Sequence, residues 1–143
     1  MTQKRRDNAS TEFGLWLRYQ NEIDSKLGFV TSNIDYVWRN YKTKEYMLIE
    51  EKRFGWFPRF YQIKTYGLID EPHRGKNNYR GFHILIFEMT NPEDGRVWLD
   101  GKIISRDQLI QWLCFKAPPD WYTTYLPKTQ ITKIKFTEVD NGN

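Results

Sequence analysis

The chain has 143 residues, of which 39% are hydrophobic, 17% aromatic and 28% charged. This composition is too apolar for a disordered chain, and no apolar run approaches the ~20 residues that span a bilayer, so we expect one folded domain over residues 1–143 and no membrane partner. A charged N-terminus without an apolar segment behind it, and a single cysteine, Cys114, favour a cytoplasmic location. The net charge of +4 is compatible with a phosphate-rich partner.

A helix and two strands are predicted first. Apolar residues at helical spacing predict a helix over about 12–26, which Ser10 or Thr11 can cap and Gly28 can end. Alternating apolar residues predict a strand from Asn33 to Arg39. A β-rich run over 46–53 follows a short polar connection, so the two strands should pair as an antiparallel hairpin.

The second half of the chain continues the alternation of helices and strands. Pro58 suits the first turn of a short helix through about Ile69, followed by a loop over 70–78 and an interior strand over 82–89. Asp100-Gly101 predicts a tight hairpin between 97–99 and 102–104. Ser105 and Gln108 form a capping box for a helix through about 114 or 115, and 130–139 could add an edge strand. The order predicts an α/β fold with a mixed central sheet flanked by helices.

Three charged side chains on the predicted hairpin are the strongest chemical signal. Side chains two apart on a strand point the same way, so Glu50 and Lys52 should emerge side by side from an otherwise apolar strand. Such charges carry a desolvation cost that calls for a reason. If the hairpin pairs as expected, Asp35 reaches the same face. Two converging carboxylates would suit Mg²⁺ or Mn²⁺.

Asp35, a turn, and then Glu50-Glu51-Lys52 resemble the PD-(D/E)XK nuclease superfamily, with Ile34-Asp35 standing where the motif has Pro-Asp. Gln62 and Tyr66 also fit the Gln-x-x-x-Tyr motif of its RecB-like members. The resemblance covers residues 12–90 and implies a restriction endonuclease-like core of helix, three strands, helix and strand. Residues 91–143 would add a C-terminal hairpin, helix and tail.

The resemblance implies metal-dependent hydrolysis of phosphodiester bonds in DNA. Asp35, Glu50 and the carbonyl oxygen of Glu51 would hold the cation, and a first-helix carboxylate, Glu12 or alternatively Glu22, would complete the site. Gln62 and Tyr66 would belong to the same site. Lys52 would orient or help deprotonate the attacking water and offset charge on the phosphorane.

Basic residues downstream could line a groove for the nucleic-acid backbone. These are Arg53, Arg59, Lys64, Arg74, Lys76 and Arg80. A non-catalytic nucleic-acid-binding module on the same fold is the alternative, and a structural or protein-interaction domain is the third reading. A homo-oligomer or a protein partner remains open.

Simpler structural roles compete with several of these assignments. Glu50 and Lys52 could be a solvated ion pair, and Glu12 could be a carboxylate favoured by the helix dipole. Cys114 reads as a small buried hydrophobe, and neither His73 nor His83 has a zinc-like partner. Five aromatic residues are expected in the core. They are Trp16, Trp38, Phe82, Phe87 and Trp112.

Overall fold

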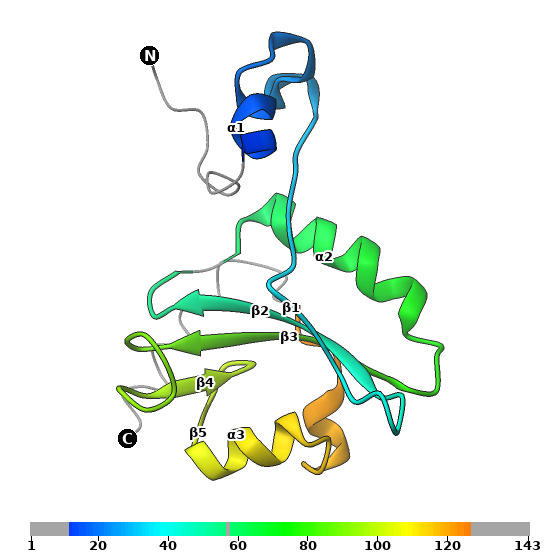
Figure 1. The fold of residues 1–143 in the computed structure, drawn as a ribbon, viewed down its shortest axis with the longest axis vertical. Coiled ribbons are helices and arrows are strands. Elements are labelled where there is room, and N and C mark those ends of the chain that lie inside the picture. Colours follow the sequence, from blue (N-terminus) through cyan, green and yellow to red (C-terminus); the bar gives the residue numbers. More distant parts are fainter. Residues whose placement is uncertain (1–11, 57, 127–143) are drawn as a thin grey trace. The chain divides into compact units, whose positions relative to one another are not determined.

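The computed structural model describes residues 12–56 and 58–126 (Figure 1). Residues 1–33 and residues 34–143 form two compact units. The single domain expected over the whole chain stays a prediction. Among the described residues, none of the helices combines the length and the apolar character needed to cross a bilayer.

In the described residues of the first unit, a short α-helix replaces the longer helix predicted. Helix α1 spans Glu12–Arg18, and two 3₁₀ helices follow at Asn21–Ile23 and Ser25–Leu27. The prediction to residue 26 is wrong beyond Arg18 because polar side chains compete for the backbone: Asp24 accepts a hydrogen bond from the Lys26 N–H at 2.9 Å. Gly28 ends the segment as predicted, with φ of 101°. Trp16, expected in the core, is 55% exposed.

The second unit is built on a five-stranded mixed sheet with the strand order β1-β2-β3-β4-β5. The strands are β1 Tyr36–Arg39, β2 Tyr46–Arg53, β3 Tyr79–Phe87, β4 Val97–Leu99 and β5 Lys102–Ile104. Neighbouring strands are antiparallel except β2 and β3, which are parallel. Helix α2, Phe60–His73, connects that parallel pair, and helix α3, Arg106–Leu113, follows β5 before a 3₁₀ turn at Pro119–Tyr122. The predicted α/β class with a mixed sheet is confirmed.

The two helices cover opposite faces of the sheet (Figure 1). Alternate residues of β2 explain this arrangement, because successive side chains on a strand point to opposite faces. Leu48 packs with Tyr66 of α2, whereas Met47 and Ile49 join the cluster around Trp112 of α3. Strand β2 is therefore buried on both sides, as parallel sheets require.

Helix α2 is longer than predicted, and a predicted loop is replaced by its last turn. It continues to His73 with Pro72 inside it. The helix tolerates Pro72 because the hydrogen bond it cannot make falls in the final turn, next to the exposed residue Leu68. Strand β3 correspondingly begins at Tyr79 and ends at Phe87, rather than spanning 82–89.

The C-terminal hairpin and helix follow the sequence prediction closely. Asp100 and Gly101 have φ of 51° and 85°, as a tight primed turn requires. The Ser105 side chain accepts a hydrogen bond from the Gln108 N–H, which begins α3 with the expected capping box. Cys114 is exposed, because it follows the last residue of α3, so its assignment to the core is wrong. The possible strand over 130–139 lies outside the described residues.

Candidate active site

Two carboxylates from neighbouring strands meet beside the start of β1. Tyr36 pairs with Ile49 in the β1–β2 ladder, so Asp35 lies opposite Glu50. The Asp35 main-chain nitrogen is 3.4 Å from Oε1 of Glu50. The Oδ2 atom of Asp35 accepts a hydrogen bond of 2.8 Å from the Glu51 N–H. The structure thus brings Asp35 and Glu50 together, as the hairpin prediction required.

Lys52 joins these carboxylates on the same face of β2. Its Nζ lies 3.4 Å from Oε2 of Glu50. The Lys52 side chain is 20% exposed and that of Glu50 is 6% exposed. A partly exposed ammonium group therefore lies next to an almost fully buried carboxylate.

Burial and a like charge act together on Glu50. Burial raises the pKa of Glu50, the Asp35 carboxylate adds to the rise, and the Lys52 ammonium group opposes it. The site therefore disfavours a second negative charge in the absence of a cation. A divalent ion between the two carboxylates would relieve that repulsion.

Glu51 offers its backbone rather than its side chain to this site. Its side chain lies on the opposite face of the sheet and accepts a hydrogen bond of 2.9 Å from the Tyr36 hydroxyl. Its N–H points toward Asp35, and the N–H and C=O of one strand residue lie on the same side of the strand. The Glu51 carbonyl oxygen is therefore directed to the side on which Asp35 lies.

The two residues of the Gln-x-x-x-Tyr pattern occupy different environments. Tyr66 is fully buried, stacks on Phe82 with ring centroids 4.7 Å apart, and has no well-formed hydroxyl hydrogen bond within the described part of the chain. Burial raises the pKa of Tyr66, and the nearby Glu50 charge adds to the rise. Gln62 accepts a hydrogen bond of 2.8 Å from the Arg59 N–H. Tyr66 thus lies against the candidate site, whereas Gln62 caps α2.

A full set of acidic ligands is not assembled within the described residues, where no group of three or more His, Cys, Asp or Glu side chains could hold a metal ion. Glu12 opens α1, and Glu22 lies in the 3₁₀ helix Asn21–Ile23. Both residues belong to the first unit, so the third carboxylate ligand stays a prediction.

Comparisons of the chain with protein-family models, curated proteins and solved structures find no match. The geometry of the residues themselves therefore carries the functional argument.

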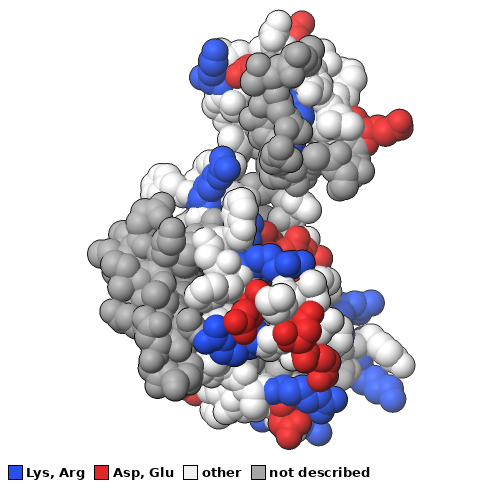
Figure 2. Space-filling view, turned by 90° about the vertical axis from the view of Figure 1, so that its left-hand side faces the viewer, with Lys and Arg blue, Asp and Glu red and all other residues white. Residues whose placement is uncertain are grey.

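The six basic residues predicted to contact nucleic acid divide between the two ends of α2. Arg53 and Arg59 are exposed where β2 ends and α2 begins, and Lys64 lies on the first half of the helix. The other three residues, Arg74, Lys76 and Arg80, follow the helix. Figure 2 shows the second unit from the side to which the β2 and β3 arrows point in Figure 1. Acidic and basic side chains are interspersed on this face.

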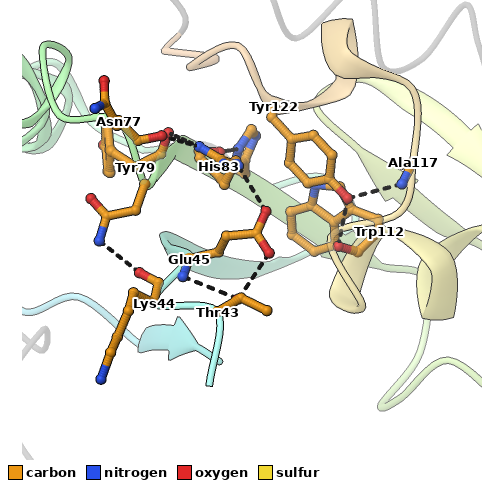
Figure 3. Close-up of polar contacts among 11 residues, drawn as sticks. Thr43, Lys44, Glu45, Asn77, Tyr79, His83, Trp112, Ala117 and Tyr122 are labelled. Carbon is orange, nitrogen blue, oxygen red and sulfur yellow. Dashed lines mark hydrogen bonds and ion pairs between the residues drawn. The ribbon is translucent and has the colours of Figure 1, made fainter. Parts of the chain in front are cut away.

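Two of the basic residues after α2 are held in ion pairs within the chain. Nε of Arg74 is 2.5 Å from Oδ2 of Asp70, and Nε of Arg80 is 3.1 Å from Oε2 of Glu45. Glu45 also accepts a hydrogen bond of 2.9 Å from Thr43, from the turn that precedes β2 (Figure 3). These guanidinium groups therefore stabilise the chain connections at the amino end of β2.

Sequence reasoning missed two buried polar centres. Asp70 is fully buried and accepts hydrogen bonds from Arg74, Tyr79 and Thr124. His83 is also fully buried, and both its ring nitrogens have partners at 2.6 Å: Nδ1 with Asp100, and Nε2 with a main-chain oxygen. No local pattern marks Asp70, but the Asp-Gly turn could have suggested that Asp100 needs a partner inside the fold.

Proposed function

We propose that this chain is a Mg²⁺- or Mn²⁺-dependent nuclease of the PD-(D/E)XK type that hydrolyses phosphodiester bonds in DNA. The observation that carries the proposal is the convergence of Asp35, Glu50 and Lys52 on one face of the sheet, with a Glu50–Lys52 separation of 3.4 Å. The Glu50 carboxylate is buried beside a second carboxylate, Asp35, and the cost of that burial is understandable if the residues serve catalysis.

The chain order around the site supports the proposal. Asp35, Glu50 and Lys52 lie on an antiparallel hairpin, and a helix and a third strand parallel to β2 follow it. This order fits the last two of the three strands, the second helix and the final strand of a restriction endonuclease-like core. The described residues hold two strands before α2 where that core has three, and β4, β5 and α3 extend the sheet beyond it.

The donors present fit a small hard cation. Mg²⁺ is commonly held by one or two carboxylates and keeps several water molecules, which matches Asp35, Glu50 and the Glu51 carbonyl oxygen. A bound divalent ion would polarise a phosphate oxygen and lower the pKa of a bound water. Asp35 and Glu50 would hold the ion, and their mutual repulsion is the feature that its charge would remove.

Lys52 supplies the mobile positive charge of the proposed site. Its ammonium group is more exposed than the carboxylate it contacts, so it can turn toward a bound phosphate or water. There it would orient the attacking water and stabilise negative charge that develops on the phosphorane. Tyr66 is fully buried and lies near Glu50 on the inner side of the site.

The test is cleavage of labelled duplex and single-stranded DNA in Mn²⁺, in Mg²⁺ and in EDTA. We expect cleavage in the presence of metal, and a loss of at least about 100-fold in Asp35→Asn and in Lys52→Met. Glu93→Gln and Lys116→Met are matched controls, because both residues are exposed and lie outside the site. Metal-dependent cleavage that persists in both site variants would refute the proposal.

A non-catalytic nucleic-acid-binding module is the second candidate. The exposed Arg53 and Arg59 at the end of β2 favour it, because each can contact a phosphate group. This candidate predicts DNA binding that weakens with salt and no cleavage in either metal. Binding without cleavage, unchanged by Asp35→Asn, would select it over the nuclease.

A further inference from the structure

Strand β1 is an open edge of the sheet within the described residues. Strand order places it at the end of the sheet, and all four of its residues are exposed. Tyr36, Val37 and Trp38 are 49%, 63% and 43% exposed. An edge strand with exposed apolar side chains is a template for pairing with another strand.

The hydrogen-bond pattern of the hairpin determines which backbone groups point outward. The Asn40 N–H donates to the Glu45 carbonyl at 2.9 Å, so these two residues form a hydrogen-bonded pair. Such pairs alternate along an antiparallel ladder, which turns the N–H and C=O groups of Tyr36 and Trp38 toward β2. Those of Val37 and Arg39 therefore face away from the sheet.

This alternation restricts how two copies of β1 can pair about a twofold axis. A residue on the axis must offer outward backbone groups to its own copy, which within β1 allows Val37 or Arg39 as the centre. A centre at Arg39 would place like charges directly opposite each other. A centre at Val37 instead places Asp35 of each copy opposite Arg39 of the other.

We propose that a second copy of this chain pairs antiparallel with β1 about Val37 and forms a continuous sheet across the two molecules. Cross-strand pairs of opposite charge stabilise one face, and Tyr36 opposite Trp38 gives two aromatic pairs on the other. Trp38 is already oriented for this role, because its indole N–H donates to the Leu113 carbonyl at 2.8 Å.

The pairing brings Arg39 of the second copy to Asp35 in the candidate active site. One oxygen of Asp35, Oδ2, accepts the Glu51 N–H, which leaves Oδ1 outside that hydrogen bond. Pairing itself does not depend on the proposed function. Only the consequence that a guanidinium group reaches the site from the second copy rests on it.

Sedimentation velocity of the full chain over a range of concentrations tests the proposal. We expect a reversible monomer–dimer equilibrium. Arg39→Glu should raise the dimer dissociation constant about tenfold or more, since two like-charge pairs replace two opposite-charge pairs. Lys116→Glu is the matched control, with the same charge change on an exposed residue outside β1, and should dimerise as the original chain does.

A mixture of two variants tests the register. Asp35→Lys and Arg39→Glu should each dimerise at least about tenfold more weakly than the original chain, and an equimolar mixture should restore the dimer because both cross-strand pairs become attractive. Val37→Lys places like charges on the axis and should also abolish the dimer without a change at Asp35. Three results would each overturn the proposal: an original chain that stays monomeric at all concentrations, a dissociation constant unchanged by Arg39→Glu, or a mixture that dimerises no better than either variant alone while circular dichroism shows both folded.

Because sedimentation velocity measures mass, an original chain that stays monomeric would leave the cleavage test unaffected, and an original chain that cleaves no DNA would leave the dimer test unaffected.

Discussion

Burial of the Glu50 carboxylate gives this residue an unusual effect on stability. Its pKa is raised above the ordinary value of 4.5, first by burial and then by Asp35. The native state therefore keeps the proton over a pH range in which the unfolded chain has lost it. The contribution of Glu50 to the free energy of unfolding should therefore fall as the pH rises above about 4.5 and through that range.

Glu50→Gln should remove this pH dependence, because an amide has no proton to lose. Urea unfolding between pH 4 and pH 8, in EDTA, should show the variant gaining stability relative to the original chain as pH rises. Addition of Mn²⁺ should stabilise the original chain and not the variant. A difference between the two proteins that stays constant with pH would contradict the cause assigned to the raised pKa.

His83 and Asp100 form a buried pair in which each residue needs the other. Nε2 of His83 faces a carbonyl oxygen and must donate, and Nδ1 shares a proton with the Asp100 carboxyl group. His83→Leu should lower the unfolding free energy by about 3 kcal/mol, because it leaves a buried carboxylate without its partner.

Asp100→Asn in the His83→Leu background should recover part of that loss, since asparagine tolerates the positive φ of 51° and carries no charge. Chemical denaturation of both variants measures the difference. A double variant less stable than His83→Leu alone would contradict the assignment.

For single residues, the sequence predicted the positions of those side chains that follow from the alternation of faces along a strand. Glu50 and Lys52 share a face because they are two apart on a strand, and the hairpin then brings Asp35 to them. Trp38 was wrongly expected in the core because alternation shows which face a side chain occupies, and not whether another element covers that face. Its exposure follows from the edge position of β1, which depends on the whole sheet.

Among the elements, α2 is the one whose end depends on contacts far away in the sequence. Asp70 accepts hydrogen bonds from Arg74, from Tyr79 at the start of β3, and from Thr124. These contacts join the last turn of α2 to two other segments. A loop was predicted at Asp70 because Pro72 and the polar residues after it dominate the local pattern, while partners 9 and 54 residues away cannot be read from it.

Asp70→Ala should destabilise the fold more at neutral pH than in acid. Burial alone would raise the pKa of Asp70, but hydrogen bonds from Thr124, Tyr79 and Arg74 outweigh burial and lower it. The stability it contributes is therefore present above the ordinary value of 3.8 and is lost as pH falls below it. We expect a loss of about 3 kcal/mol at pH 7, measured by urea unfolding, and a smaller loss near pH 3.

Asp70→Asn is the matched control, because it keeps the shape and one acceptor oxygen and should lose less than the alanine variant. An equal loss at both pH values would contradict a role for the charge.

For the whole molecule, the order of helices and strands predicted the class of fold, but the composition did not predict the distribution of charge. A net charge of +4 suggested a basic surface, yet acidic and basic side chains are mixed on the face that Figure 2 shows. The helix α2 has 14 residues and so separates its two basic groups by about 20 Å. Alternation within single elements could not reveal that separation, because it arises from the way α2 crosses between two parallel strands.

This separation predicts unequal contributions to DNA binding. Arg53 and Arg59 lie near the carboxyl end of β2, close to Lys52 in the sequence. Arg74 and Arg80 lie beyond the carboxyl end of α2, where each forms an ion pair with an acidic side chain. Arg59→Ala should weaken binding and reduce the slope of log K against log salt by about 1, since one phosphate contact is lost. Lys76→Ala, an exposed residue beyond the far end of α2, should leave that slope unchanged although it removes the same charge. Fluorescence anisotropy over a salt series, in EDTA to prevent cleavage, measures both variants. Equal slopes for the two would mean that net charge, and not position relative to the candidate site, governs binding.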